Sequence, residues 1–257
     1  MNAYETWIAF QTIVIREIRR FSRIWMQTLL PPVITMGLYF VIFGKLIGSR
    51  IGEMGGFTYM EFVVPGLIMM SVLTNAYSNV VSSFYGNKFQ HSIEEQLIAP
   101  IPNWVILAGY ITGGVARGLL IGVIVTLLSL FFTRLHIQHW GVMISVVLLT
   151  SILFSLAGLI NAVYAKSFDD ISIIPIFVLT PLTYLGGVFY SINLLPPFWQ
   201  SISQINPILY MVNAFRYGVL GISDVSITFA FGMIIFFIII AATTAMHLLK
   251  SGKGLRS

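Results

Sequence analysis

The sequence lacks cysteine altogether and is poor in charged residues. Without cysteine, disulfides and thiolate metal sites are excluded. Only 9% of the residues are charged and 57% are hydrophobic, whereas soluble domains carry about 25% charged residues. A soluble fold of this composition would cover its surface with apolar side chains and aggregate. The composition therefore predicts a membrane protein.

Catalytic and nucleotide-binding motifs are also missing. The chain contains no HExxH, no GxSxG and no GxxxxGK[ST] pattern. His136 and His139 are three residues apart but have no third metal ligand nearby. Neighbouring carboxylates at 94–95 and 169–170 point apart on a helix, which favours solvated charge over an acid–base pair. We therefore expect no enzyme activity and no cofactor or metal bound by this chain. Any active transport would draw on an ion gradient or on another subunit.

Long runs without charge predict the architecture. A helix that crosses a bilayer needs about 20 mostly apolar residues. The sequence predicts an all-α membrane protein with six transmembrane helices, at about 25–48, 60–83, 104–133, 141–165, 171–191 and 227–248. Prolines at 31, 32, 175 and 181 predict that the first and fifth of these are not straight.

The distribution of basic residues predicts the orientation, because Lys and Arg concentrate on the cytoplasmic side. An even number of spans puts both termini on one side. If that side is cytoplasmic, nine basic residues lie inside: Arg16, Arg19, Arg20, Arg23, Lys88, Lys166, Lys250, Lys253 and Arg256. Four lie outside: Lys45, Arg50, Arg134 and Arg216. We therefore expect both termini in the cytoplasm, and topology rather than nucleic acid as the reason for the basic balance.

Residues 1–24 precede the first span and predict an amphipathic helix in the membrane interface. Apolar residues recur at helical spacing and form one predicted face: Trp7, Phe10, Val14, Ile18, Phe21 and Trp25. The predicted polar side carries Thr12, Arg16, Arg19, Arg20 and Arg23. Basic helices with tryptophan on the apolar face lie along membrane surfaces. This segment either anchors the chain or forms an elbow leading into the first span, and the two roles are compatible.

The third span carries Arg117 and a series of glycines. Arg117 is the one basic residue predicted inside the membrane, either with a structural partner or lining a conduit. Gly114, Gly118 and Gly122, like Gly109 and Gly113, are four residues apart. This spacing allows close helix packing, within one subunit or between two. The absence of a mid-membrane carboxylate argues against an ion-driven carrier.

Two further segments are too polar or too interrupted to span a membrane. Residues 88–100 include a predicted short helix at 90–98 on the cytoplasmic face, ended by Pro100. Residues 192–222 are apolar but broken by prolines, which predicts a re-entrant hairpin at the outer side. Within it, Asn206 and Pro207 suit a helix start and Gly221 a helix end. Arg216 would then lie near the outer end of that helix, solvated by water or headgroups.

These two segments carry a resemblance to a known family. The stretch "LTYLGGVFYSINLLPPFWQSISQINPILYMVNAFRYGVLG" resembles the C-terminal signature of ABC transporter permeases of the type-2 exporter class. The matching residues are Leu195, Pro196, Trp199, Asn206, Pro207, Tyr210, Arg216 and Gly221. Ser191 departs from the pattern, since relatives often have proline there. The stretch "IEEQLIAPIPNW" is similar to the family's cytoplasmic coupling helix, which here comprises Ile93, Glu94, Glu95, Gln96, Leu97 and Pro100.

The resemblance covers essentially the whole chain and implies a single permease domain over residues 1–257. Two copies would form the pathway in a bacterial inner membrane, and two copies of a separate ATPase, which binds ATP and Mg, would dock on the cytoplasmic side. The expected function is export of an amphipathic drug, a lipid or a glycan. An ion-gradient-driven single-chain transporter and a non-transporting membrane anchor stay open as alternatives.

Overall fold

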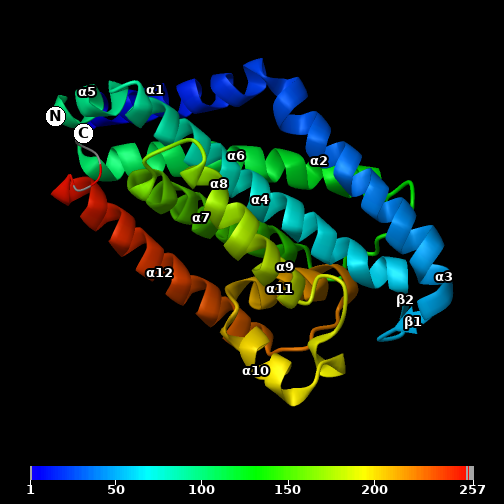
Figure 1. The fold of residues 1–257 in the computed structure, drawn as a ribbon. Helices are drawn as coiled ribbons and strands as arrows, with labels where there is room; N and C mark the ends of the chain where they lie inside the picture. Colours follow the sequence, from blue (N-terminus) through cyan, green and yellow to red (C-terminus); the bar gives the residue numbers. More distant parts are fainter. Residues whose placement is uncertain (1, 253, 255–257) are drawn as a thin grey trace.

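The computed structural model describes residues 2–252 and 254 of the chain. Lys253 and Arg256, which entered the orientation argument, lie outside the described residues. The fold is almost entirely helical (Figure 1). The first half contains α1 (Ala3–Arg23), α2 (Trp25–Tyr39), the π-helix η1 (Phe40–Ile47), α3 (Gly48–Ile51), β1 (Glu53–Met54), β2 (Phe57–Thr58), α4 (Tyr59–Phe89), α5 (Ser92–Ile98) and α6 (Asn103–Ser129). The second half contains α7 (Trp140–Tyr164), α8 (Asp170–Ile174), the π-helix η2 (Pro175–Leu179), α9 (Thr180–Leu185), the 3-10 helix η3 (Ile192–Leu194), α10 (Pro197–Ile205), α11 (Pro207–Leu220) and α12 (Ile227–Ser251).

Five helical runs within the described residues are long and apolar enough to cross a membrane, by length and composition. They are Trp25–Ile51, α4, α6, α7 and α12. The all-α membrane class predicted from hydropathy is confirmed. The fifth predicted span, 171–191, is instead the shorter apolar run Asp170–Leu185. It ends early because Gly186 closes the helix and Gly187 adopts a left-handed φ of 71°. The six-span count therefore stays a prediction.

The long helices form one bundle with α4 at its centre (Figure 1). Within α4, 83% of the apolar window is buried, against 12% for Trp25–Ile51 and 11% for α12. The latter two runs therefore form much of the exposed apolar surface. The start of α1, the helix α5 and the end of α12 lie at one end of the bundle, here called the α5 end (Figure 1). The β1–β2 hairpin and α10 lie at the other, here called the β1 end.

Local sequence explains several helix boundaries. Asn2 with Glu5, and Thr58 with Glu61, form capping boxes that start α1 and α4. The predicted irregularity of the proline-bearing helices is confirmed by the π-helical turns. One π-turn follows Pro31 and Pro32, and the other begins at Pro175. At Pro175 the missing backbone donor coincides with the wider turn, whereas Phe40–Ile47 begins beyond the hydrogen bonds that Pro31 and Pro32 remove.

The two helices expected in the 192–222 segment are present as α10 and α11. Asn206 Oδ1 accepts a hydrogen bond from the backbone N–H of Ile208, and Pro207 occupies the first turn of α11. Gly221 ends α11 with a left-handed φ of 77°. Helix α11 is largely buried against α4, α7 and α12. Its position in the membrane, and hence the re-entrant character of the segment, stays a prediction.

Candidate coupling site

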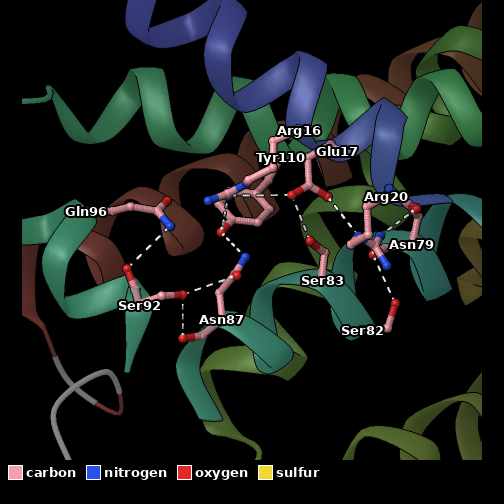
Figure 2. Close-up of polar contacts among 10 residues, drawn as sticks. All are labelled: Arg16, Glu17, Arg20, Asn79, Ser82, Ser83, Asn87, Ser92, Gln96 and Tyr110. Carbon is pink, nitrogen blue, oxygen red and sulfur yellow. Dashed lines mark hydrogen bonds and ion pairs between the residues drawn. The ribbon is translucent and has the colours of Figure 1, made fainter. Parts of the chain in front are cut away.

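A polar cluster lies at the α5 end, where four elements of the chain meet (Figure 2). The cluster draws Arg16, Glu17 and Arg20 from α1; Asn79, Ser82, Ser83 and Asn87 from α4; Ser92 and Gln96 from α5; and Tyr110 from α6. Only 9% of the residues are charged, and Arg16, Glu17 and Arg20 meet at this junction, which is therefore the candidate coupling site.

Glu17 is the centre of the cluster and is fully buried. Its Oε1 accepts a hydrogen bond of 2.8 Å from Ser83 Oγ on α4. Two guanidinium groups flank the carboxylate, with Arg16 Nη2 at 3.5 Å from Oε1 and Arg20 Nε at 3.5 Å from Oε2. A buried carboxylate needs such partners because its desolvation is costly. Both ion pairs lie within α1, and the hydrogen bond from Ser83 joins the carboxylate of α1 to α4.

Small residues on α6 allow α1 to come this close. A Cβ added at Gly113 would lie 2.5 Å from Glu17 Cβ, and one added at Gly109 would lie 2.5 Å from Ile13 Cγ2. Neither separation leaves room for a methyl group. The spacing of Gly109 and Gly113 predicted a close helix approach, and the structure assigns that approach to α1.

Further hydrogen bonds continue from α1 to α5. Arg16 Nη2 donates to Tyr110 Oη at 2.9 Å, and Asn87 Nδ2 donates to the same oxygen at 2.7 Å. Ser92 Oγ at the start of α5 donates at 3.2 Å to the backbone carbonyl and to Oδ1 of Asn87. Arg20 Nη2 donates to Asn79 Oδ1 at 2.8 Å. A continuous set of polar contacts therefore joins α1 to α5 through α4 and α6 (Figure 2).

Helix α5 is buried at Ile93 and exposed on its outer side. Ile93 is fully buried in the bundle, whereas Glu95 and Pro100 are exposed and Ile98 is 84% exposed. The other predicted coupling residues, Glu94, Gln96 and Leu97, are half-buried. Beside α5, a hollow of about 440 Å³ is lined by Leu97, Ile98 and the end of α12 around Lys250, among others. The predicted residues lie together at one surface, and their role in coupling stays a prediction.

The predicted faces of α1 were partly wrong. The side that packs on the bundle carries Ile13, Glu17 and Phe21, and of these Phe21 belongs to the predicted apolar face. Trp7 is exposed. Arg16 and Arg20 turn toward α4 and α6, while Arg19 and Arg23 are exposed. The periodic pattern located the helix but could not give its rotation, because Glu17 and the glycines of α6 decide which side docks.

Arg117 and the later glycines of α6 lie inside the bundle. Arg117 Nη2 donates to Asn75 Oδ1 at 3.0 Å and contacts the carbonyl of Thr28 at 3.4 Å. These contacts favour the structural reading of Arg117 over the conduit. A Cβ at Gly114 would collide with Ser155 Oγ of α7. The space at Gly118 and Gly122 is likewise filled by residues of this chain: Val72, Ala76 and Ser151. These glycines pack within one subunit.

The expectation that water or headgroups solvate Arg216 was wrong. Arg216 is 1% exposed, and its Nη2 donates a 2.6 Å hydrogen bond to the carbonyl of Gly187. Its guanidinium lies 3.9 Å from the ring centroid of Phe62, a cation–π contact. The prediction failed because it placed α11 at the surface, whereas α11 packs into the bundle. The other signature residues lie on α10 and α11 or cap them: Pro196, Trp199, Asn206, Pro207, Tyr210 and Gly221.

The acidic pairs and the histidines belong to no cluster that could hold a metal ion within residues 2–252 and 254. No group of three or more His, Asp or Glu side chains there could hold a metal ion. Asp170 accepts hydrogen bonds from the backbone N–H groups of Lys166 and Ser167, which lower the pKa of its carboxyl group. Asp170 therefore serves to start the helical run at Asp170–Leu185. Glu17 is the functional candidate that the sequence analysis missed, since it stands among arginines assigned to a solvated face.

Comparison with known proteins agrees with this architecture. Residues 8–220 match the model of the family described as "ABC-2 type transporter". The chain is 61% identical over 251 residues to "Inner membrane transport permease YadH" of Escherichia coli (strain K12), covering 98% of each chain. It is 23% identical over 217 residues to "Nodulation protein J" of Rhizobium leguminosarum bv. viciae, covering 83% of each.

The fold and these matches define a multi-helix membrane permease. The chain belongs to the ABC-2 type transporter family, as the resemblance in the α5 and α10–α11 segments indicated.

Proposed function

We propose that the chain is the membrane-spanning subunit of an ATP-driven exporter in a bacterial inner membrane. Two copies form the pathway, two copies of a separate ATPase dock at the α5 end, and both termini face the cytoplasm. The cargo class is an amphipathic drug, a lipid or a glycan. The family match and the printed name of the Escherichia coli relative support a transport permease.

The observation that carries the proposal is the construction of the α5 end. A docking element for a motor must expose a contact surface and be attached firmly to the parts that move. Helix α5 exposes Glu95 and Ile98 while Ile93 is fully buried. Its first residue, Ser92, is hydrogen-bonded to Asn87 of α4. A force applied to α5 is therefore passed directly to the central helix of the bundle.

The same geometry supports a mechanism for moving the membrane part. ATP binding closes the partner dimer and displaces α5. The displacement reaches α4 through Asn87 and reaches α1 through Tyr110 and Arg16. Helices α1 and α4 then shift together because Glu17 ties them at Ser83. Rigid-body rocking of two packed halves about an interface is a known switching mode, and here it would alternate access to the pathway.

The test is to purify the tagged chain from its native membrane in mild detergent and to identify the proteins that accompany it. We expect an ATPase with a GxxxxGK[ST] motif at one copy per chain. The matching variant carries Glu95→Arg with Ile98→Asp, which alters only exposed positions of α5. It should lose the ATPase that accompanies the unaltered chain.

A chain that purifies alone, even after crosslinking in the membrane, would contradict the proposal. Transport that stops with an ionophore while ATP stays high would then support the ion-driven alternative. A folded chain that transports nothing would support the anchor.

A further inference from the structure

A basic groove runs along α1 on the side next to the coupling site. It has a volume of about 700 Å³ and is lined by Thr12, Ile15, Arg16, Arg19, Arg20, Arg23 and Ile24. Four of these seven residues are arginines, in a chain with only 9% charged residues. The groove lined by these residues is called the arginine groove below.

The positive charge of the arginine groove exceeds the negative charge around it. Among the described residues, Glu17 is the one carboxylate within ion-pair distance of the groove, and Arg16 and Arg20 share it. Arg19 and Arg23 are exposed, and no hydrogen bond or ion pair links them to another described residue. Two guanidinium groups are therefore left for an anionic ligand from outside the chain.

Exposed apolar side chains on α1 indicate the source of that ligand. Trp7, Ile8, Ile15 and Ile18 expose between 38% and 54% of their surface. These residues lie on a different side of α1 from the buried Ile13, Glu17 and Phe21. A helix that exposes an apolar stripe beside an arginine stripe suits the boundary between acyl chains and headgroups. At that boundary the available anion is the phosphate of a phospholipid.

We propose that the arginine groove is a binding site for the headgroup of an anionic phospholipid. Arg19 and Arg23 bind the phosphate oxygens, a geometry that the planar guanidinium fork suits well. Arg16 and Arg20 border the same groove and also hold Glu17, Tyr110 and Asn79. A bound headgroup therefore adds negative charge next to the contacts that join α1 to α4 and α5. The lipid composition of the membrane would thereby adjust how firmly α1 is held at the coupling site.

The test measures lipid binding directly and uses the purified full-length chain. The delipidated protein in detergent is offered phosphatidylglycerol and phosphatidylethanolamine of equal chain length, and bound lipids are counted by native mass spectrometry. We expect the wild type to prefer phosphatidylglycerol. In the variant Arg19→Gln with Arg23→Gln, the ratio of bound phosphatidylglycerol to bound phosphatidylethanolamine should fall. We expect a fall of about fivefold for each arginine removed, and so of about 25-fold for the pair.

Two controls separate this site from general charge effects. Arg50→Gln with Arg134→Gln removes the same charge at exposed positions outside the arginine groove and should keep the preference. Arg19→Lys with Arg23→Lys keeps the charge and should keep most of it, which also excludes misfolding as the cause. Equal losses in the Arg19/Arg23 and Arg50/Arg134 glutamine pairs, or no preference in the wild type, would overturn the proposal. Displacement of the lipid by inorganic phosphate, but not by chloride of equal ionic strength, would assign the groove to a soluble anion instead.

This inference does not depend on the partner ATPase. The binding measurement contains the chain and lipid alone, so its failure would leave the proposed function untouched. Conversely, a chain that purifies without an ATPase could still show the lipid preference.

Discussion

Charged residues of this chain do structural work where they are buried. Glu17 and Arg216 are both almost fully buried, and each has different partners. Glu17 has two arginines and a serine hydroxyl, whereas Arg216 has a backbone carbonyl and an aromatic ring. The arginines beside Glu17 are visible in the sequence, whereas Ser83, Gly187 and Phe62 come from elements far away along the chain.

Removal of the Glu17 carboxylate should loosen α1. We expect Glu17→Ala to lower the free energy of unfolding by about 2 kcal/mol, since it leaves Arg16 and Arg20 partly buried without a carboxylate. The value is below that of a fully buried pair because both arginines are partly exposed and screened by solvent. The thermal midpoint of the purified chain in detergent measures the effect.

Glu17→Gln is the matched control, because its amide oxygen can still accept the hydrogen bond from Ser83 Oγ. It should be less destabilised than Glu17→Ala and should differ from the wild type mainly at low ionic strength. Equal midpoints for the wild type and Glu17→Ala would show that the carboxylate does not hold α1 in place.

At the scale of helices, the packing of α6 against α4 and α7 depends on glycine. A methyl group at Gly114 would collide with Ser155 Oγ and would also approach Val80 Cγ2 to 2.6 Å. We expect Gly114→Ala to destabilise the bundle by about 1–3 kcal/mol through overpacking. Thermal unfolding in detergent is again the measurement.

Gly86 in α4 provides the control for this substitution. No atom lies within 4 Å of a Cβ added there, so Gly86→Ala should be neutral or slightly stabilising through helix propensity. The double variant Gly114→Ala with Ser155→Ala should recover part of the loss, because the hydroxyl that collides is then absent. If Gly114→Ala were as stable as Gly86→Ala, the helices would not be as close as described.

The positions of the helices along the chain were largely predictable. Their rotation about their own axes and their burial in the bundle were not. Long apolar runs located α4, α6, α7 and α12 because hydropathy alone separates a span from a loop. The rotation of α1 depends on Gly109 and Gly113 of α6, more than 90 residues away. The burial of α11 in the bundle depends on Phe62 and Gly187, which contact Arg216 only once the bundle is packed. Of the candidate coupling site, the short helix α5 was predicted, whereas the link between α1 and α4 through Glu17 was missed.

For the whole molecule, the distribution of burial indicates how the bundle meets its surroundings. Helix α4 is enclosed by the chain itself, while Trp25–Ile51 and α12 are mostly exposed along their apolar lengths. Exposed apolar surface of this extent requires lipid or another subunit. One cluster of polar contacts lies at the α5 end (Figure 2), and another surrounds Asp224 near the β1 end. The molecule is therefore an apolar bundle with a polar junction of α1, α4, α5 and α6 at the α5 end, where we propose that the ATPase docks.

The most direct test of this account is the rate of ATP hydrolysis by the reconstituted complex of this chain with its ATPase. We predict that Glu95→Ala with Leu97→Ala on α5 lowers the turnover toward that of the isolated ATPase. Glu53→Ala with Leu46→Ala, which removes the same residue types at exposed positions near the β1 end, should keep the wild-type rate. An unchanged rate in the α5 variant, with the ATPase still bound, would contradict the claim that α5 couples ATP hydrolysis to the membrane bundle.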